Sequence, residues 1–272
     1  MTTQAAPCKV LMLHGFSQNA SIFGKRLAAL RKSLGPNIEL VFVNAPIALR
    51  RIDLAGSASE PSLDAVGASE ANPDSTDEKD APRAWWRADR ARQTAKGLED
   101  TLIYIREILR KDRFDGVFGF SQGAGFAPLL AALLERPHVY PPFLVDGLPP
   151  HPPFKFCISV AGFKAPGELS QKIYSQMYTT PTLLVMGKND IIVVEERSKM
   201  LMEVAENIRV EQHDGGHFVP SKVNWRVFLK GWMENPQGRV PSPSAITMTN
   251  AEPEPATRGR RRRSSLKRAA NL

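Results

Sequence analysis

The chain has 272 residues, of which 42% are hydrophobic and 24% charged, as is usual for globular proteins that can build a core. This composition excludes a chain that is disordered throughout, and the two cysteines exclude a small domain held by disulfides. The formal net charge is +8, but residues 236–272 hold eight Lys or Arg and two Asp or Glu, so this segment contributes +6. Residues 1–235 are nearly neutral, and their charge indicates no nucleic-acid or membrane-surface function.

The cellular location is predicted from the cysteines and the apolar runs. Cys8 and Cys157 lie in apolar, strand-like segments and are predicted to be buried thiols in a reducing compartment. The N-terminus has no secretory signal pattern, and the longest apolar run, residues 124–134, is too short to span a bilayer. We therefore expect a cytoplasmic protein with no membrane span.

Strand-like and helix-like segments alternate along residues 1–235. The predicted strands lie at 8–16, 38–46, 116–121, 155–163, 182–190 and within 207–217, and most of them are continuous Val-, Ile-, Leu- and Phe-rich runs. The predicted helices cover 21–34, 93–111, 122–135, 194–206 and 221–234, with Pro128 expected to bend the third or delay its start. This alternation predicts one α/β domain with a mostly parallel central sheet and helices on both faces.

Three segments do not fit the alternation. Residues 53–82 have no apolar period and are predicted to be a disordered insert or a lid. Residues 136–154 contain seven prolines and are predicted to be an extended surface insertion. Residues 236–272 are predicted to be a disordered basic tail.

The clearest motif is Gly119-Phe120-Ser121-Gln122-Gly123, a G-x-S-x-G between a predicted strand and a predicted helix. In such an elbow the serine hydroxyl is exposed at the strand end and serves as a nucleophile, while the flanking glycines permit the tight turn. The alternative is an ordinary glycine-rich turn whose serine caps the helix. The strand–turn–helix context favours the nucleophile.

A serine nucleophile needs a base and an acid that orients the base. His217 follows the last predicted strand in a glycine loop, where the base belongs when the order is Ser, acid, His. Asp190 ends the preceding predicted strand and is the favoured acid. Asp214 is the competing acid, although it lies only three residues before His217 and is more typical of a turn residue.

The oxyanion of an acyl-transfer transition state needs hydrogen-bond donors. We expect the backbone N–H of Gln122 to be one donor and that of Phe16, in the loop after the first strand, to be the other. His14 is predicted to shape this loop by hydrogen bonding and not to be the base.

Cofactor and metal motifs are not supported by the spacing. A dinucleotide fingerprint starting at Gly123 has Pro128 where it needs glycine, and no phosphate-binding G-x-x-x-x-G-K-[ST] is present. His213 and His217 are four positions apart, as in a helical zinc pair, but the two glycines between them argue against a helix there. The predicted enzyme uses neither cofactor nor metal.

Four blocks, LMLHGFSQNASIF, FDGVFGFSQGAG, LLVMGKNDIIVVEERS and HDGGHFVP, resemble the fungal serine hydrolase (FSH) family of α/β-hydrolases. That family also includes a human ovarian-tumour-suppressor-candidate hydrolase and fungal thioesterases that release polyketides from their carriers. The resemblance extends from about Cys8 to Met233 and implies an α/β-hydrolase fold with a triad of Ser121, Asp190 and His217. The inserts and the basic tail depart from the family pattern.

These observations predict a serine esterase or thioesterase acting on a small-molecule ester or acyl thioester. The resemblance implies a role in secondary metabolism, with an acyl carrier domain of a polyketide synthase as partner. A general small-ester carboxylesterase and a catalytically idle binding protein on the same fold are the alternatives. Trp85, Trp86 and Phe163 are predicted either to line the acyl pocket or to be ordinary core aromatics.

The tail carries the remaining prediction. Arg260–Arg263 and the serines after them are typical of a nuclear signal, a contact with nucleic acid or another anionic surface, or a phosphorylation site. The simplest interpretation is a solvated, disordered end.

Overall fold

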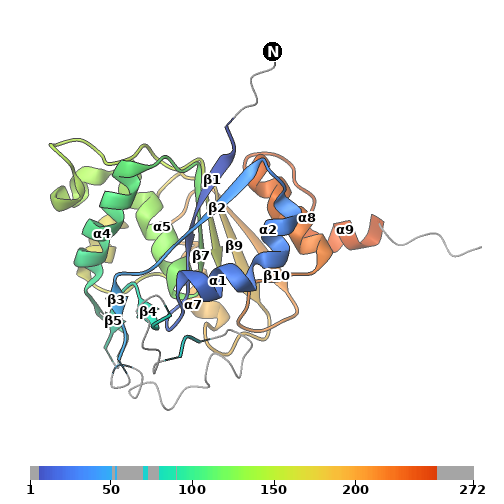
Figure 1. Cartoon of the computed structure of the whole chain (residues 1–272), viewed down its shortest axis with the longest axis horizontal. Coiled ribbons are helices and arrows are strands. Elements are labelled where there is room, and N and C mark those ends of the chain that lie inside the picture. Colours follow the sequence, from blue (N-terminus) through green and yellow to red (C-terminus); the bar gives the residue numbers. More distant parts are fainter. Residues whose placement is uncertain (1–5, 51–52, 54–69, 73–79, 90, 250–272) are drawn as a thin grey trace, which may run out of the picture.

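The computed structural model describes residues 6–50, 53, 70–72, 80–89 and 91–249, which contain a central sheet of six parallel strands (Figure 1). The strands are β1 (Cys8–Leu13), β2 (Ile38–Val43), β7 (Gly116–Phe120), β8 (Phe156–Val160), β9 (Thr182–Gly187) and β10 (Ile208–His213). Their order is β10-β9-β8-β7-β1-β2, with parallel pairing throughout. Each lies in a predicted run, so the predicted parallel α/β architecture is confirmed.

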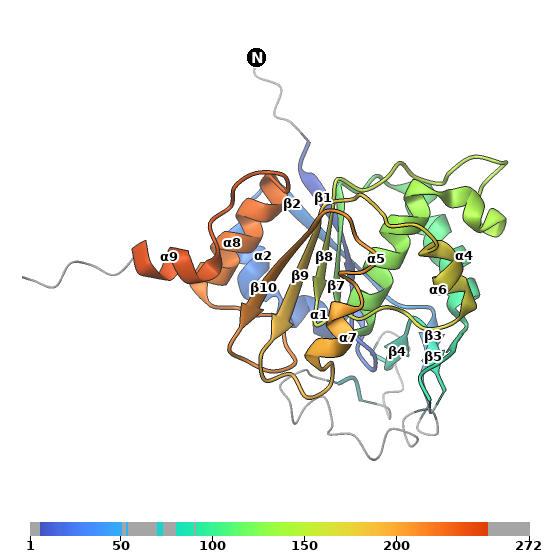
Figure 2. The same cartoon turned by 180° about the vertical axis from the view of Figure 1, so that it is seen from behind.

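Helices cover both faces of this sheet (Figures 1 and 2). One face carries α4 (Leu98–Lys111), α5 (Gln122–Glu135) and α6 (Glu168–Ile173), and the other carries α1 (Ala20–Arg26), α2 (Ala28–Leu34) and α8 (Val223–Glu234). Successive strand residues point to opposite faces, so Leu11 and Leu13 pack with the first group while Val10 and Met12 pack with the second. The central strands β7, β8 and β9 are therefore buried along almost their whole length, as in doubly covered parallel sheets, whereas the edge strand β10 carries polar side chains such as Arg209 and Glu211.

Pro128 lies inside α5 without ending the helix. A proline cannot donate the i→i−4 hydrogen bond, so the carbonyl of Ala124 loses its usual helical partner. The Ser159 hydroxyl of β8 donates to that carbonyl at 2.9 Å. This bond satisfies the freed acceptor and joins α5 to the middle of the sheet.

Two predicted helices are shorter than expected because their backbones pair elsewhere. The helix predicted to begin at Gln93 is α4 and begins at Leu98, since β6 (Ala95–Lys96) pairs with β5 (Arg87–Ala88). The helix predicted for 194–206 is α7 (Glu195–Lys199), because the backbone around Ala205 hydrogen-bonds with Tyr178.

The proline-rich segment 136–154 is more compact than the predicted extended insertion. It forms two short 3₁₀ helices, η1 (Pro137–Val139) and η2 (Pro141–Phe143), and buries Phe143 completely. The prediction for residues 53–82 falls mostly outside the described residues. Next to that insert, β3 (Ile47–Ala48) pairs with β4 (Arg83–Ala84) in an antiparallel arrangement.

The prediction that residues 236–272 are disordered is wrong for their first part. Residues 243–249 form α9 (Pro243–Thr249), and the side chains of Val240 and Ile246 pack against the cluster beside α8. Arg209 also donates to the Val240 carbonyl, which fixes this segment to β10. Residues 250–272, including the Arg260–Arg263 run, lie outside the described residues.

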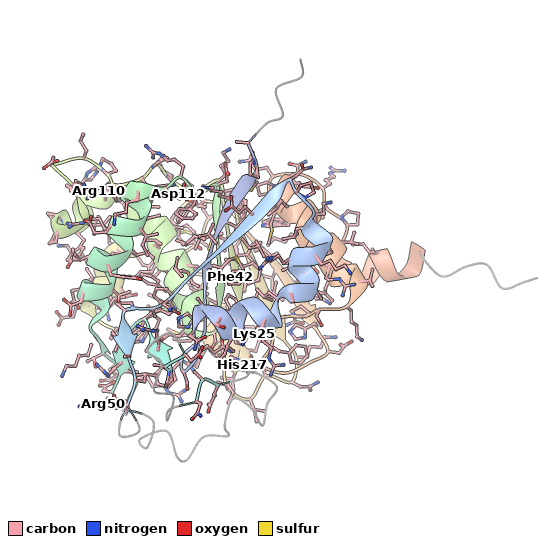
Figure 3. The ribbon with its side chains drawn as sticks, viewed as in Figure 1. Lys25, Phe42, Arg50, Arg110, Asp112 and His217 are labelled. Atoms are coloured by element: carbon pink, nitrogen blue, oxygen red, sulfur yellow. The ribbon has the colours of Figure 1, made fainter. Side chains whose placement is uncertain are left out.

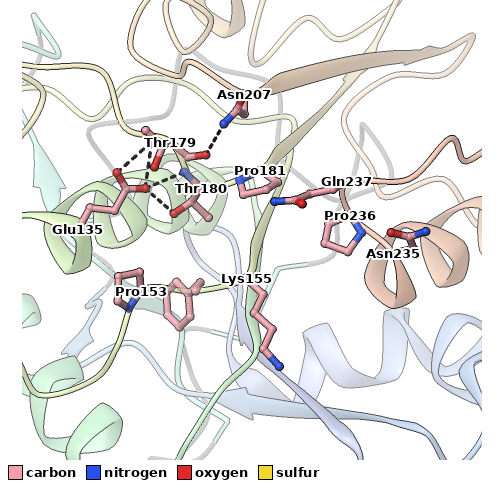
Figure 4. A pocket seen from close by; sticks show the side chains of 11 residues that line it. Glu135, Pro153, Lys155, Thr179, Thr180, Pro181, Asn207, Asn235, Pro236 and Gln237 are labelled. Atoms are coloured by element: carbon pink, nitrogen blue, oxygen red, sulfur yellow. Dashed lines mark hydrogen bonds between the residues drawn. The ribbon is translucent and has the colours of Figure 1, made fainter.

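A cleft of about 590 Å³ opens at the edge of the sheet where the strands begin (Figure 4). Its lining includes Lys155, Pro181 and Asn207, which lie just before β8, β9 and β10, respectively. Glu135, at the end of α5, accepts hydrogen bonds there from the backbone N–H groups of Thr179 and Thr180. Among the described residues, none of the helices has the length and apolar character needed to cross a bilayer.

Candidate active site

Ser121 lies at the opposite edge, in the turn between β7 and α5. Its backbone has φ 52° and ψ −115°, a conformation that costs energy for a residue with a Cβ. A Cβ on Gly119 would come within 2.1 Å of the Gly123 carbonyl oxygen, and one on Gly123 within 2.2 Å of the Leu13 carbonyl oxygen. The two motif glycines are therefore required by close backbone approaches.

Ser121, His217 and Asp190 form a continuous hydrogen-bonded series. The Ser121 Oγ lies 2.9 Å from His217 Nε2, and His217 Nδ1 lies 2.8 Å from Asp190 Oδ2. All three residues are buried, and Figure 3 shows His217 at the edge where the strands end. When Nδ1 donates to Asp190, Nε2 is left as an acceptor for the serine proton.

The loop after β9 fixes the Asp190 carboxylate. Its Oδ1 accepts hydrogen bonds from the backbone N–H groups of Ile192 and Val193, both at 2.9 Å. Its Oδ2 remains for His217. Every hydrogen bond of this carboxylate therefore serves either its own loop or the imidazole.

The His217 loop packs against the end of β9. The Asn189 N–H donates to the Gly215 carbonyl, and a Cβ on Gly187 would lie 2.4 Å from the Gly216 carbonyl oxygen. The competing acid, Asp214, points outward: its carboxylate pairs with Lys188 at 2.7 Å and is 90% exposed. Lys188 also lowers the pKa of Asp214. Asp214 therefore serves the loop surface and does not contact the imidazole.

The loop after β1 lies against the first turn of α5, where a Cβ on Gly123 would also contact the His14 carbonyl oxygen. Within the described part of the chain, the backbone N–H groups of Phe16 and Gln122 donate to no protein acceptor. The buried His14 ring lies between the carbonyl of Gly15 and the N–H of Ala45, at 2.8 and 3.0 Å. Burial lowers its pKa to about 4, so His14 is neutral and accepts from Ala45.

The Gln122 side chain connects the elbow to the two tryptophans. Its Oε1 accepts from the Trp85 N–H at 2.9 Å, and its Nε2 donates to the Trp86 carbonyl at 2.8 Å. Trp85 stacks on Phe126 in the core, whereas Trp86 meets Phe163 edge to face. Both tryptophans are completely buried, so they pack as core residues, and their predicted pocket role stays a prediction.

Two residues near the site were not singled out as functional from the sequence. His213 accepts from the Gly215 N–H at 3.2 Å, its ring packs between Phe218 and Trp225, and burial lowers its pKa. It therefore supports the His217 loop. The other residue, Arg197, stacks on Phe163; a lone arginine in a short helix gives no sequence signal of such a contact.

A model of the family described as "Serine hydrolase (FSH1)" matches residues 1–229, which is most of the chain. The chain belongs to the FSH1 family of serine hydrolases. The resemblance deduced from the four sequence blocks is thereby confirmed, and this member of the family is an enzyme.

The chain is similar to several relatives that have names. It is 31% identical over 233 residues to "Esterase OVCA2" of Danio rerio, covering 82% of this chain and 94% of that protein. It is 33% identical over 231 residues to "Family of serine hydrolases 3" of Saccharomyces cerevisiae, covering 83% of each. A Schizosaccharomyces pombe protein named "Dihydrofolate reductase" is 31% identical over 92% of this chain, which spans about half of that protein's length (52%).

Solved structures agree on the fold. Zea mays acyl-protein thioesterase 2 is similar with a TM-score of 0.56 and 18% identity, covering 87% of this chain and 96% of that one. Arabidopsis thaliana SOBER1 gives a TM-score of 0.53 at 14% identity, covering 86% of this chain and all of that one. The chain therefore has the α/β-hydrolase fold.

Proposed function

We propose that this protein hydrolyses a carboxylic ester or acyl thioester through a Ser121-His217-Asp190 triad. The observation that carries the proposal is the hydrogen-bonded series from Ser121 Oγ through the imidazole to the Asp190 carboxylate. Family membership and the relatives named as esterases support the same chemistry. A catalytically idle binding protein would require neither this hydrogen-bonded series nor the strained backbone conformation of Ser121.

In the proposed mechanism, Ser121 Oγ attacks the acyl carbon while His217 Nε2 takes the hydroxyl proton. Asp190 holds the imidazole through Nδ1 and stabilises its cation. The N–H groups of Phe16 and Gln122, which donate to no described protein atom, receive the oxyanion. His217 then protonates the leaving group, and water clears the acyl-enzyme by the same steps in reverse.

The test is the Ser121→Ala variant with p-nitrophenyl butyrate, together with labelling by a fluorophosphonate probe. We expect turnover to fall by about 10⁴-fold or more and labelling to disappear, because the nucleophile is gone. Ser159→Ala is the matched control, since Ser159 is a buried serine on the neighbouring strand β8 and its hydroxyl donates to the Ala124 carbonyl of α5. Labelling that survives in folded Ser121→Ala protein would refute the proposal.

For the substrate, we propose an apolar acyl chain, with a carrier-bound polyketide-type thioester in fungal secondary metabolism as the specific case. The near-neutral body and the aromatic side chains near the elbow support an apolar chain. Each buried methylene contributes about 0.8 kcal/mol, nearly fourfold in kcat/KM, until the pocket is full. We propose a cytoplasmic location because both cysteines are free thiols.

A matched N-acetylcysteamine thioester and alkyl ester of one acyl chain separate the candidates. The thioester should react at least as fast, because a thiolate leaves with little help from His217. Rates should also rise from acetyl to medium-chain acyl groups. A preference for the oxygen ester, or a steady fall in rate beyond acetyl, would instead favour a general small-ester carboxylesterase.

A further inference from the structure

Arg197 lies on α7 with its guanidinium stacked on an aromatic ring. The guanidinium carbon is 4.3 Å from the centroid of the Phe163 ring, and Nη1 donates to the Ile192 carbonyl at 3.3 Å. A guanidinium that stacks through its face keeps its N–H groups in the plane, where they can reach an acceptor. The N–H groups of Arg197 that make no hydrogen bond are not buried, so they reach solvent.

The arginine is fixed close to the nucleophile. The Ser198 hydroxyl donates to the Gly162 carbonyl at 2.8 Å and so attaches α7 to the end of β8. The same strand end accepts the Ser121 N–H through the Val160 carbonyl at 2.9 Å. A Cβ on Gly125, in the first turn of α5, would lie 2.8 Å from the Phe163 carbonyl oxygen and 3.6 Å from its ring. Phe163 therefore bridges the nucleophile's helix and Arg197.

The charge of Arg197 has no carboxylate partner in ion-pair contact among the described residues, and one hydrogen bond is all that its side chain makes there. Its pKa is lowered by burial and by the positive charge of Arg92, while the charge of Asp190 raises it. The Asp190 carboxylate is already engaged by His217 and by its own loop. A partly buried cation beside a second cation is stabilised when an anion binds.

We infer that Arg197, which is fixed close to the Ser121 nucleophile, is an anion-binding residue that recognises a carboxylate or phosphate carried by the substrate. This inference rests on the proposed function and deepens it. Two sources supply such a group: a carboxylate at the far end of the acyl chain, or a phosphate on the leaving thiol. In either case the substrate is neutral at the reacting carbonyl and anionic at a distance from it.

The experiment compares matched neutral and anionic substrates. One pair is p-nitrophenyl butyrate and the p-nitrophenyl monoester of glutaric acid, and the other is butyryl-pantetheine and butyryl-4′-phosphopantetheine. For Arg197→Gln, the ratio of anionic to neutral kcat/KM should fall about 10- to 100-fold in one pair, because hydrogen bonds to charged groups contribute on that scale. The pair that responds identifies the source of the anion.

Two further variants test whether the effect belongs to this side chain. Arg197→Lys keeps the charge without the planar fork and should retain part of the preference, which also covers the case in which Arg197→Gln does not fold. Lys199→Gln removes a charge from the same helix, where Lys199 pairs with Glu195, and should leave both ratios unchanged. Glutarate and inorganic phosphate should inhibit hydrolysis of the neutral ester, one of them more weakly in the Arg197 variants.

Equal losses on the neutral and anionic members of both pairs would show that Arg197 only supports the fold, and unchanged kcat/KM values for all four substrates would show that it binds no anion. Both outcomes overturn this inference while leaving the triad intact. Absence of any Ser121-dependent turnover of p-nitrophenyl butyrate by wild-type protein would instead overturn the proposed function.

Discussion

Replacing Asp190 by asparagine should remove activity through the geometry of one carboxyl group. Its Oδ1 accepts two backbone N–H groups, from Ile192 and Val193, while Oδ2 faces His217 Nδ1. An asparagine oxygen would keep the position with two donors, so its NH₂ group would face Nδ1. The imidazole would then carry its proton on Nε2 and could not accept the proton of Ser121.

The magnitude follows from the cost of turning the amide round. The flipped amide would leave the N–H groups of Ile192 and Val193 unsatisfied, at about 1–3 kcal/mol each. A total of about 2–6 kcal/mol corresponds to a loss of roughly 30-fold to 10⁴-fold. The upper end matches the loss of about 10⁴-fold that a wrong tautomer causes in triad hydrolases.

The assay is kcat for p-nitrophenyl butyrate, with thermal unfolding to confirm that each variant is folded. Asp214→Asn is the matched control, because Asp214 is exposed and pairs with Lys188, and its activity should stay within about twofold of wild type. A folded Asp190→Asn enzyme that keeps more than about a tenth of wild-type kcat would refute the tautomer argument. A greater loss in Asp214→Asn would move the acid to the His217 loop.

Three further outcomes are expected. The pKa of His14 is about 4 in the folded protein and 6.5 in the unfolded chain, so the unfolded chain binds the proton first as the pH falls. The His14 contribution to the free energy of unfolding is therefore highest above pH 6.5 and falls by about 3 kcal/mol as the pH drops to 4. In urea unfolding, the free energy of unfolding of His14→Gln should fall by about 2 kcal/mol less between pH 7 and 5 than that of wild type. Deletion of 250–272 should not change the melting temperature. Deletion of 240–272 should lower the free energy of unfolding by about 1–3 kcal/mol, and with it the melting temperature, because the contacts of Val240 and Ile246 with the core are lost. Equal melting temperatures for the two truncated proteins would contradict this. Gly187→Ala should reduce kcat at least tenfold, because its Cβ would displace the His217 loop. Gly216→Ala should reduce kcat less, because its Cβ would lie 3.3 Å from the nearest atom, the Asn189 carbonyl oxygen. The reverse ranking would show that the loop accommodates the added Cβ at position 187 without moving His217.

The sequence predicted the sheet because both of its faces are covered, so that most of its strands are nearly continuous apolar runs. It also predicted where Ser121, Asp190 and His217 would lie, since each follows a strand and parallel strands end at one edge. The hydrogen bonds among the three residues join positions that are 27 and 96 residues apart, and only the folded chain brings them together.

What the sequence did not predict depends on contacts between distant segments. The helix expected at 194–206 ends early because Tyr178 pairs with the backbone around Ala205, which no local pattern records. Residues 236–249 were expected to be disordered from their composition, yet Arg209 anchors them through a carbonyl. Arg197 has its environment from Phe163, 34 residues earlier in the chain, so its position in the sequence gave no reason to single it out.

Glu135 connects two elements of the active site at a point remote from Ser121. Ser121 precedes α5, and Glu135 is the last residue of that helix, about 20 Å away at 1.5 Å per residue. Its carboxylate holds Thr179 and Thr180 just before β9, the strand whose far end leads to Asp190. The nucleophile at the start of α5 and the acid after β9 thus belong to two elements that the Glu135 hydrogen bonds join at their remote ends. The cleft in Figure 4 therefore lies beside the hydrogen bonds that join α5 to the segment before β9, at the ends of these elements that are remote from the triad.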